Sequence, residues 1–346
     1  MDLVAGVLAG ERLALARLIT QVENDTPEGR EALNRLFSHT GKAHLIGVTG
    51  SPGTGKSSLV NLIAKAYRTP ADGMQPCKVA VVAVDPSSPF TGGALLGDRV
   101  RMRDLAGDPG VFVRSMASRG ALGGLSHSTA AVVQVLDAAG FDKILIETVG
   151  AGQSEVDIAR LAHTTLVVEA PGLGDDIQAI KAGILEIADI LVVNKADRPG
   201  VENTERALRS NLELAHPERM RTGSCGRGGK ANQPKSGAPE ALDEQIWVPP
   251  VLRTIATQAS GVTELVAAIE CHLAHLRVTG EWQEREHERL QTELNQLLQA
   301  VLVARWREGV SEAELRDVVS RLQDRELSPL KAVEQLLDLD AVPESY

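Results

Sequence analysis

The stretch that decides the fold reads Gly50-Ser51-Pro52-Gly53-Thr54-Gly55-Lys56-Ser57. It matches the G-x-x-x-x-G-K-[ST] phosphate-loop pattern at every fixed position. The apolar run 44–49 before it reads as a buried strand, and residues 57–66 after it read as a helix. Because a phosphate loop needs this strand–loop–helix setting, the flanks argue against a chance match. The alternative is a glycine-rich turn with a solvated lysine.

The residue types of this loop suit a nucleoside triphosphate. Glycines let backbone N–H groups curl inward around a phosphate, and the following helix points its positive dipole end at the same anion. Lys56 is predicted to reach the β- and γ-phosphates, and the Ser57 hydroxyl to hold Mg²⁺. We predict that nine consecutive residues bind the nucleotide: Gly50, Ser51, Pro52, Gly53, Thr54, Gly55, Lys56, Ser57 and Ser58.

The composition is that of a globular protein with an aliphatic core. Of 346 residues, 43% are hydrophobic and only 3% aromatic, which leaves few platforms for stacking nucleic-acid bases. The net charge of −10 has the wrong sign for binding a phosphate backbone, so no nucleic-acid partner is expected. Three scattered cysteines suit a reducing compartment, and neither a signal peptide nor an apolar run of membrane-spanning length is visible. We therefore expect a cytoplasmic location and no membrane partner.

Beyond the phosphate loop, short aliphatic runs alternate with helical stretches. Unbroken apolar runs are typical of parallel strands that are covered on both faces. The runs predict strands at 44–49, 78–84, 111–115, 143–147, 164–170, 189–193 and 250–254. The stretches between them predict helices at 57–67, 98–106, 126–138, 174–187, 201–215 and 261–275. The pattern favours an α/β fold, a P-loop NTPase with a doubly wound, mostly parallel sheet.

The ends of the chain differ from this alternating part. Apolar spacing predicts one helix over 2–22 and another over 27–39, so residues 1–41 are expected to form a helical extension. Residues 42–276 are expected to form the P-loop GTPase domain. Within it, 223–245 is rich in Gly, Pro, Ser and Lys, and is predicted to be a flexible insertion.

Residues 277–346 are predicted to form a C-terminal helical segment of three helices. In the first of them, Leu290, Leu294, Leu297 and Val301 are spaced by four, three and four residues, which is typical of a packed helix seam. Such a seam can pack within the chain or on a second copy. We expect a homodimer contact.

Asn194-Lys195-Ala196-Asp197 follows the apolar run 190–193 directly. This is the N-K-x-D pattern of a guanine reader. Guanine presents two adjacent donors, N1–H and the N2 amine, which one carboxylate can accept, whereas adenine presents an acceptor at N1. A site built for hydrogen bonds rejects a ligand that lacks them by a factor on the order of 10⁴. Asp197 is therefore predicted to select GTP over ATP, with Asn194 tying the loop and Lys195 covering the base.

Two predicted strands end in carboxylates. Asp85 follows 79–84 and Glu147 follows 143–146. Acidic groups beside a bound phosphate make sense when Mg²⁺ lies between them, although a helix cap or a solvated loop would also explain them. Gly150 would offer its N–H to the γ-phosphate. Asp98 lies at a predicted helix start, where capping alone is the alternative to metal binding.

The glutamine that orients the attacking water in many GTPases is missing, because Ala151 follows Gly150. Gln153 lies two residues further along, but its spacing does not establish the role. Since phosphoryl transfer depends on positioning and charge stabilisation, we expect a low intrinsic rate of GTP hydrolysis that a partner stimulates.

Three longer stretches resemble the MeaB/ArgK family of G-proteins. They are Asp85-Pro86-Ser87-Ser88-Pro89-Phe90-Thr91-Gly92-Gly93, running on to Met102, then 147–155, and Ala170-Pro171-Gly172-Leu173-Gly174-Asp175-Asp176, running on to Lys181. Together with the phosphate loop, the similarity spans nearly the whole chain. Members of this family are chaperones of adenosylcobalamin-dependent acyl-CoA mutases, typically methylmalonyl-CoA mutase.

The resemblance implies a function and a set of site residues. GTP binding and hydrolysis would gate cobalamin loading and protect or reactivate the mutase, and the C-terminal helices would hold a homodimer. Lys56, Asp98 and Glu147 would be catalytic, and Ser57, Asp85, Asp98 and Glu147 would hold Mg²⁺. Residues 170–181 would be a switch loop that Lys181 closes, and the effector loop of the first switch would fall at 113–120.

The resemblance also places a second base-contacting segment. The stretch that matches the family's Ser-Ala-Leu motif reads Thr254-Ile255-Ala256-Thr257, so the serine is lost. We expect the nucleotide contacts of Ile255, Ala256 and Thr257 to be made by the backbone.

Three other classes of function stay open at this point. A metallochaperone GTPase for metalloenzyme maturation would need clustered thiolates or imidazoles, and the eight histidines and three cysteines form no such cluster in the sequence. A P-loop kinase would use the same loop and metal, although most small-molecule kinases use ATP rather than GTP. A scaffold that binds GTP without turnover is a third possibility.

Overall fold

The structure is a computed structural model, which describes residues 2–70, 75–86, 103–105, 107–118, 127–148, 154–172, 186–215 and 246–337. The chain divides into two compact units, Met1–Arg289 and Leu290–Tyr346. Each is described by itself.

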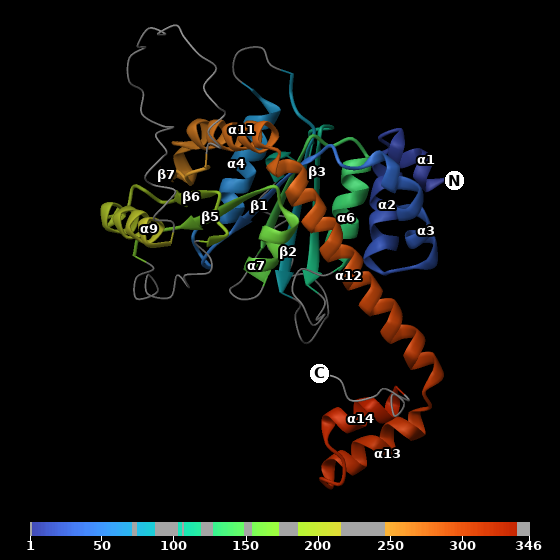
Figure 1. Cartoon of the computed structure of the whole chain (residues 1–346). Helices are drawn as coiled ribbons and strands as arrows, with labels where there is room; N and C mark the ends of the chain where they lie inside the picture. The colour runs from blue at the N-terminus through green and yellow to red at the C-terminus, as the bar shows by residue number, and fades with distance from the viewer. Residues whose placement is uncertain are drawn as a thin grey trace, which may run out of the picture. The chain divides into compact units, whose positions relative to one another are not determined.

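The first unit is built on a seven-stranded sheet in the order β3-β2-β4-β1-β5-β6-β7 (Figure 1). Every strand pair is parallel. The strands are β1 His44–Thr49, β2 Val79–Pro86, β3 Val111–Ser118, β4 Lys143–Thr148, β5 Thr164–Glu169, β6 Ile190–Val193 and β7 Val251–Arg253. The predicted doubly wound sheet is thus confirmed, and all seven predicted strands are present.

Helices cover both faces of the sheet. Successive strand residues point to opposite faces, so Val79 and Val81 pack in one core and Ala80 and Val82 in another. The first core lies under α4 (Lys56–Arg68) and α11 (Val262–Thr279), which lie together in Figure 1. The opposite face is covered by α6 (His127–Ala138), α7 (Ser154–Leu161) and α9 (Val201–Ala215).

The N-terminal residues form three helices rather than the two predicted. The break falls at Gly10, which has φ +78°, between α1 (Leu3–Leu8) and α2 (Arg12–Glu23). A glycine adopts this left-handed conformation without the steric strain that a side chain would cause, so the chain can turn here. The apolar spacing continues on both sides of the turn. The third helix, α3 (Pro27–Leu36), starts with the predicted Pro27 and is followed by a 3₁₀ turn, η1 (Phe37–His39). The helices share a core with α6.

Several other predictions need correction or lie outside the described residues. Residues 113–118, expected in the effector loop, belong to strand β3. Helix α7 was not predicted. The insertion 223–245 lies outside the described residues, as does the expected helix 174–187 apart from its last two residues. Of the expected helix 98–106, only η2 (Arg103–Leu105) is described.

The amino-terminal ends of the strands, called here the amino edge, carry a chain of buried polar side chains. His44, the first residue of β1, lies with Nδ1 3.5 Å from Lys143 Nζ and Nε2 2.7 Å from Thr164 Oγ1. Thr164 Oγ1 lies 2.8 Å from His272 Nδ1, and His272 Nε2 lies 3.3 Å from Asp189 Oδ1. Because the lysine can only donate, the donors run in one direction, from Lys143 through His44 and Thr164 to His272.

This amino edge also holds the start of α12 (Glu281–Gly309). Arg285 donates to both carboxylate oxygens of Asp189, at 2.8 and 2.9 Å, and to the carbonyl of His163. His163 Nδ1 accepts the Leu45 N–H at 3.1 Å, which leaves Nε2 to donate to Glu286. Burial lowers the pKa of His163, although Glu286 opposes this, so the ring is neutral near pH 7.

The second unit contains the rest of α12, α13 (Glu312–Gln323) and α14 (Pro329–Leu336), so the three predicted C-terminal helices are present. Trp306 Nε1 donates to the Leu336 carbonyl at 2.8 Å and ties α12 to α14. No residue of α12 is fully buried, and Leu294 of the predicted seam is 64% exposed. In the described part of the chain, no helix has the length and apolar character needed to cross a membrane.

Candidate functional site

The phosphate loop lies at the carboxyl-terminal ends of the strands, called here the carboxyl edge. It follows β1 directly and lies against β5, the neighbour of β1 in the sheet. Gly50 has φ +131°, and a Cβ there would lie 2.1 Å from the Val168 carbonyl oxygen. The glycine is thus required by both backbone conformation and close approach to β5, as expected where a loop must wrap tightly.

Lys56 starts helix α4 and is 6% exposed. Its ammonium donates to the carbonyls of Gly50 at 2.7 Å and Ser51 at 3.0 Å, across the mouth of the loop. These contacts hold the charge against the backbone of the loop that is predicted to bind phosphate. The arrangement fits the predicted role of Lys56.

Two of the four predicted metal ligands are brought together. Ser57 Oγ donates to Glu147 Oε1 at 2.6 Å, and Glu147, in strand β4, is 1% exposed. A hydroxyl and a carboxylate are the hard oxygen donors that Mg²⁺ prefers, so this pair fits the ion. Asp85 is the penultimate residue of β2, two places from β1 in the sheet, but its side chain is not described. Asp98 and Gly150 lie outside the described residues. Within those residues, no three acidic, histidine or cysteine side chains are grouped to hold a metal.

Asn194 interlocks the predicted base reader with the phosphate loop. Its Nδ2 donates to the Thr54 carbonyl at 2.7 Å. A Cβ at Gly55, which has φ +94°, would lie 2.6 Å from that same nitrogen. Lys195, at φ +57°, donates from Nζ to the Gly53 carbonyl at 2.5 Å. The two motifs, 140 residues apart, therefore form one continuous surface at the carboxyl edge.

The segment after β7 completes this surface. Asn194 Oδ1 accepts from Thr254 Oγ1 at 3.1 Å and from the Ala256 N–H at 3.2 Å. Every polar atom of the Asn194 amide group thus has a partner in either the phosphate loop or the 254–257 segment. Asp197 is exposed on the turn after Lys195, and Ile255 and Thr257 lie at the start of the 3₁₀ turn η4 (Ala256–Gln258). Asp197 is accessible to a ligand, as a base reader must be.

Two residues of this site were missed by the sequence reasoning. Thr254 begins the segment in which the family's serine is lost, yet its buried hydroxyl donates to Asn194 Oδ1 and holds that side chain in place. Glu169 ends strand β5, and its Oε1 accepts from Ser51 Oγ at 3.2 Å. The signal for Glu169 was available, since an apolar run that ends in a carboxylate is the same pattern that singled out Asp85 and Glu147.

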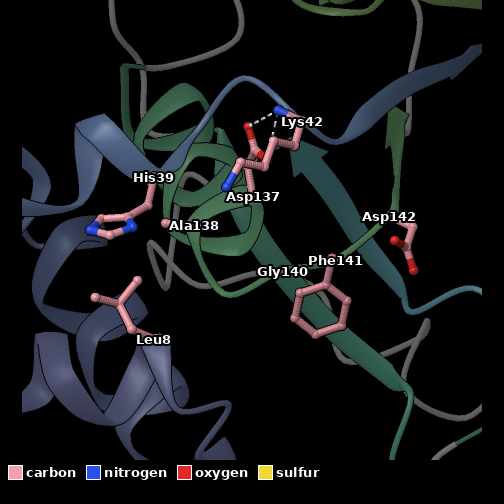
Figure 2. Close-up of a pocket in the computed structure, with 8 residues that line it drawn as sticks. All are labelled: Leu8, His39, Lys42, Asp137, Ala138, Gly140, Phe141 and Asp142. Atoms are coloured by element: carbon pink, nitrogen blue, oxygen red, sulfur yellow. Dashed lines mark hydrogen bonds between the residues drawn. The ribbon is translucent and has the colours of Figure 1, made fainter.

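A separate cavity of about 430 Å³ lies away from this site, near the start of β4 (Figure 2). Its lining includes Leu8 and His39 from the N-terminal helices and Phe141 from the turn before β4. The Asp137 carboxylate beside it accepts the N–H groups of Gly41, Lys42 and Ala43. Asp137 is thus used to fix the chain entering β1, and none of the predicted site residues lines this cavity.

Comparison with known proteins identifies relatives over almost the whole chain. Residues 15–311 match the family described as methylmalonyl Co-A mutase-associated GTPase MeaB. A Pyrococcus horikoshii protein named as a GTPase is 41% identical over 337 residues, which cover 97% of each chain. The GTPase ArgK of Escherichia coli is 33% identical, covering 94% of this chain and 92% of its own.

A solved structure has the same fold. The crystal structure of a LAO/AO transport system kinase superimposes with a TM-score of 0.67 at 25% identity, covering 99% of this chain and 97% of that one. The match confirms the predicted P-loop NTPase fold.

Proposed function

Since the chain belongs to the MeaB family of methylmalonyl-CoA mutase-associated GTPases, we propose that it is a GTP-dependent chaperone of an adenosylcobalamin-dependent acyl-CoA mutase. Methylmalonyl-CoA mutase is the first candidate for the partner. GTP binding and hydrolysis would gate cobalamin loading and protect or reactivate that enzyme. The observation that carries the nucleotide part is the Asn194 side chain, which joins the phosphate loop to the base-reading segments through three hydrogen bonds.

The proposed roles follow from the contacts. Residues Gly50–Ser58 would cradle the phosphates, with Lys56 supplying a positive charge to the β- and γ-phosphates and Gly150 an N–H. Asp197 would accept from guanine, and Lys195 would cover the base. The backbone of Ile255–Thr257 would line the same pocket. Lys56, Asp98 and Glu147 would stabilise the charge that develops during phosphoryl transfer.

Mg²⁺ would be held by Ser57 and Glu147, together with Asp85 and Asp98. When bound, the ion neutralises negative charge on the phosphate oxygens of the nucleotide. Glu147 would orient the Ser57 hydroxyl from within the core, because its carboxylate is fixed on strand β4 and shielded from water.

We further propose that the protein is a homodimer held in part by its C-terminal helices. Leu294, Leu298 and Val301 on α12 are each at least 46% exposed, as are Leu330 and Val333 on α14. Soluble monomers seldom expose contiguous apolar patches of large size. Light scattering should give twice the mass of one chain, and Leu294→Asp with Leu298→Asp should halve it. A monomer in the unsubstituted protein would refute this contact.

The chaperone role is tested with a purified partner. The protein, loaded with a non-hydrolysable GTP analogue or with GDP, is mixed with adenosylcobalamin-dependent methylmalonyl-CoA mutase and run on a gel-filtration column. We expect co-elution that depends on the nucleotide, and GTP hydrolysis that the mutase stimulates. Lys181→Ala, which changes the segment that the family resemblance assigns to a switch, should reduce that stimulation. Equal co-elution with either nucleotide and unchanged hydrolysis would contradict the proposal.

A further inference from the structure

Glu169 places a carboxylate against a loop whose task is to bind anions. It is the last residue of β5, is 7% exposed, and its Oε1 lies 3.2 Å from the Ser51 hydroxyl in the phosphate loop. The two strands involved, β1 and β5, are neighbours in the sheet (Figure 1). The backbones are also in close contact, since a Cβ at Gly50 would lie only 2.1 Å from the Val168 carbonyl oxygen. The carboxylate is therefore buried beside the phosphate loop and held there by a hydrogen bond.

The same residue contacts the base-reading loop through its main chain. The Glu169 carbonyl accepts the Asn194 N–H at 2.8 Å. This double contact follows from the strand order, because β5 lies between β1, which leads into the phosphate loop, and β6, which leads into Asn194. Glu169 thus touches both halves of the nucleotide site.

A negative charge at this position acts on a bound nucleotide. Like charges repel more strongly in a partly desolvated site than in bulk water, because the effective dielectric constant is lower. A nucleoside triphosphate carries one more negative charge than the diphosphate and would be repelled more. The hydrogen bond to Ser51 does not require this charge, since the amide oxygen of a glutamine can also accept it.

We propose that Glu169 is a positioning and specificity-determining residue: it holds the phosphate loop through Ser51, and its charge weakens GTP binding relative to GDP binding. This inference rests on the proposed nucleotide site. According to this inference, the ratio of GTP affinity to GDP affinity is set by a residue that lies outside the known motifs. A lower preference for the triphosphate would favour the diphosphate-bound form until a partner changes the site.

The test is Glu169→Gln, which keeps the shape and the acceptor but removes the charge. Affinities for fluorescent GDP and for a fluorescent non-hydrolysable GTP analogue are measured with excess Mg²⁺ at low and high salt. We expect the ratio of affinities to shift toward the triphosphate by roughly three- to tenfold at low salt. The shift should shrink as added salt screens the interaction.

Two further variants separate charge from structure. Glu264→Gln removes the same charge from an exposed position in the first turn of α11 and should leave the ratio unchanged. Ser51→Ala removes the hydrogen bond but keeps the carboxylate, so it should weaken both nucleotides and leave the ratio close to that of the unsubstituted protein.

An unchanged ratio in Glu169→Gln at low salt would overturn the inference, as would an equal shift in Glu264→Gln or in Ser51→Ala. Failure of the proposed function has a different signature. In that case the unsubstituted protein would bind neither guanine nucleotide, whichever residue stands at position 169.

Discussion

The two edges of one sheet use polar side chains in opposite ways. At the carboxyl edge, Lys56, Asn194 and Lys195 bind backbone carbonyls of the phosphate loop and shape a surface that is open to a ligand. At the amino edge, polar groups bind one another: the Asp189 carboxylate accepts two hydrogen bonds from Arg285 and lies 3.3 Å from His272. The polar groups of the carboxyl edge therefore serve ligand recognition, and those of the amino edge hold the helices that pack against it.

The electrostatics of the amino edge follow from this pairing. Burial and then the nearby Lys143 charge hold the pKa of His44 well below its ordinary value. Burial alone would raise the pKa of Asp189, but its hydrogen bonds with His272 and Arg285 hold it well below the usual range. Near pH 7, His44 and His163 are therefore neutral and Asp189 is ionised. We expect changes at the carboxyl edge to alter ligand binding, and changes at the amino edge to alter stability.

The largest expected effect is at the carboxyl edge. In Asp197→Asn an amide donor faces the guanine donors, so two charge-assisted hydrogen bonds are lost. At about 1.5–3 kcal/mol each, GTP should bind roughly 10²- to 10⁴-fold more weakly. Xanthosine triphosphate, which presents an acceptor where guanine has its amine, should bind better to this variant. Calorimetry with both nucleotides checks this, and the unfolding midpoint should not move. An unaltered GTP affinity would show that Asp197 does not read the base.

At the amino edge, the largest effect is expected for Asp189→Asn, which should lower the free energy of unfolding. Removing one partner of a buried ion pair leaves the other charge uncompensated, which costs about 3–5 kcal/mol. Since the Arg285 side chain is 30% exposed, we expect the free energy of unfolding to fall by about 3 kcal/mol, the lower end of this range. Denaturant unfolding followed by the fluorescence of Trp247 and Trp282, which lie beside the histidines, measures it.

The matched control for Asp189→Asn is Glu312→Gln, whose exposed ion pair with Arg316 should contribute little. Nucleotide affinity should be unchanged in both variants. If Asp189→Asn lost GTP affinity but not stability, the assignment of ligand binding to the carboxyl edge and of stability to the amino edge would be wrong.

A smaller effect is expected at Thr254, which supports Asn194 and does not reach the ligand itself in this account. Thr254→Val keeps the shape but removes the donor to Asn194 Oδ1, so about 1 kcal/mol should be lost, or roughly fivefold in guanine nucleotide affinity. Thr279→Val, at an exposed helix end, is the control. If Thr254→Val and Thr279→Val bind guanine nucleotides with the same affinity, Thr254 is not a positioning residue.

Acid should act mainly on the amino edge. The pKa values of His44 and His163 are lower in the folded chain than in the unfolded one, so the folded chain binds fewer protons below about pH 6.5 and loses stability there. Burial opposes ionisation of Glu286, but hydrogen bonds with His163 and Arg289 lower its pKa to about 2. Asp189 and Glu286 therefore add a further loss below about pH 4.

Unfolding midpoints measured from pH 8 to pH 4 check this. The expected loss is about 1.4 kcal/mol for each unit by which a histidine pKa is lowered. His163→Gln should flatten the upper part of the profile. Stability that stayed constant between pH 7 and pH 5 would contradict neutral, buried histidines.

The carboxyl edge could be predicted from sequence largely because its motifs are local. The phosphate loop and Asn194-Lys195-Ala196-Asp197 are short, and each follows an apolar strand that structure and sequence place alike. Glu169 and Thr254 were missed because their roles come from neighbours in space: Ser51 lies 118 residues from Glu169, and Asn194 lies 60 from Thr254.

The amino edge could not be predicted for the same reason. Asp189 meets His272 and Arg285 through the packing of two helices under the sheet, and nothing around Asp189 in the sequence signals a buried ion pair. Likewise, the turn at Gly10 depends on the backbone conformation of one residue. Apolar spacing does not indicate it, since the buried positions continue on both sides of the turn.

We expect the interlocked surface at the carboxyl edge to select a guanine nucleotide. The most direct test is calorimetric titration of the unsubstituted protein, with Mg²⁺, using non-hydrolysable analogues of GTP and ATP in parallel. We predict saturable binding of the guanine analogue and a preference over the adenine analogue on the order of 10³-fold or more. Equal affinity for the two analogues would contradict the account.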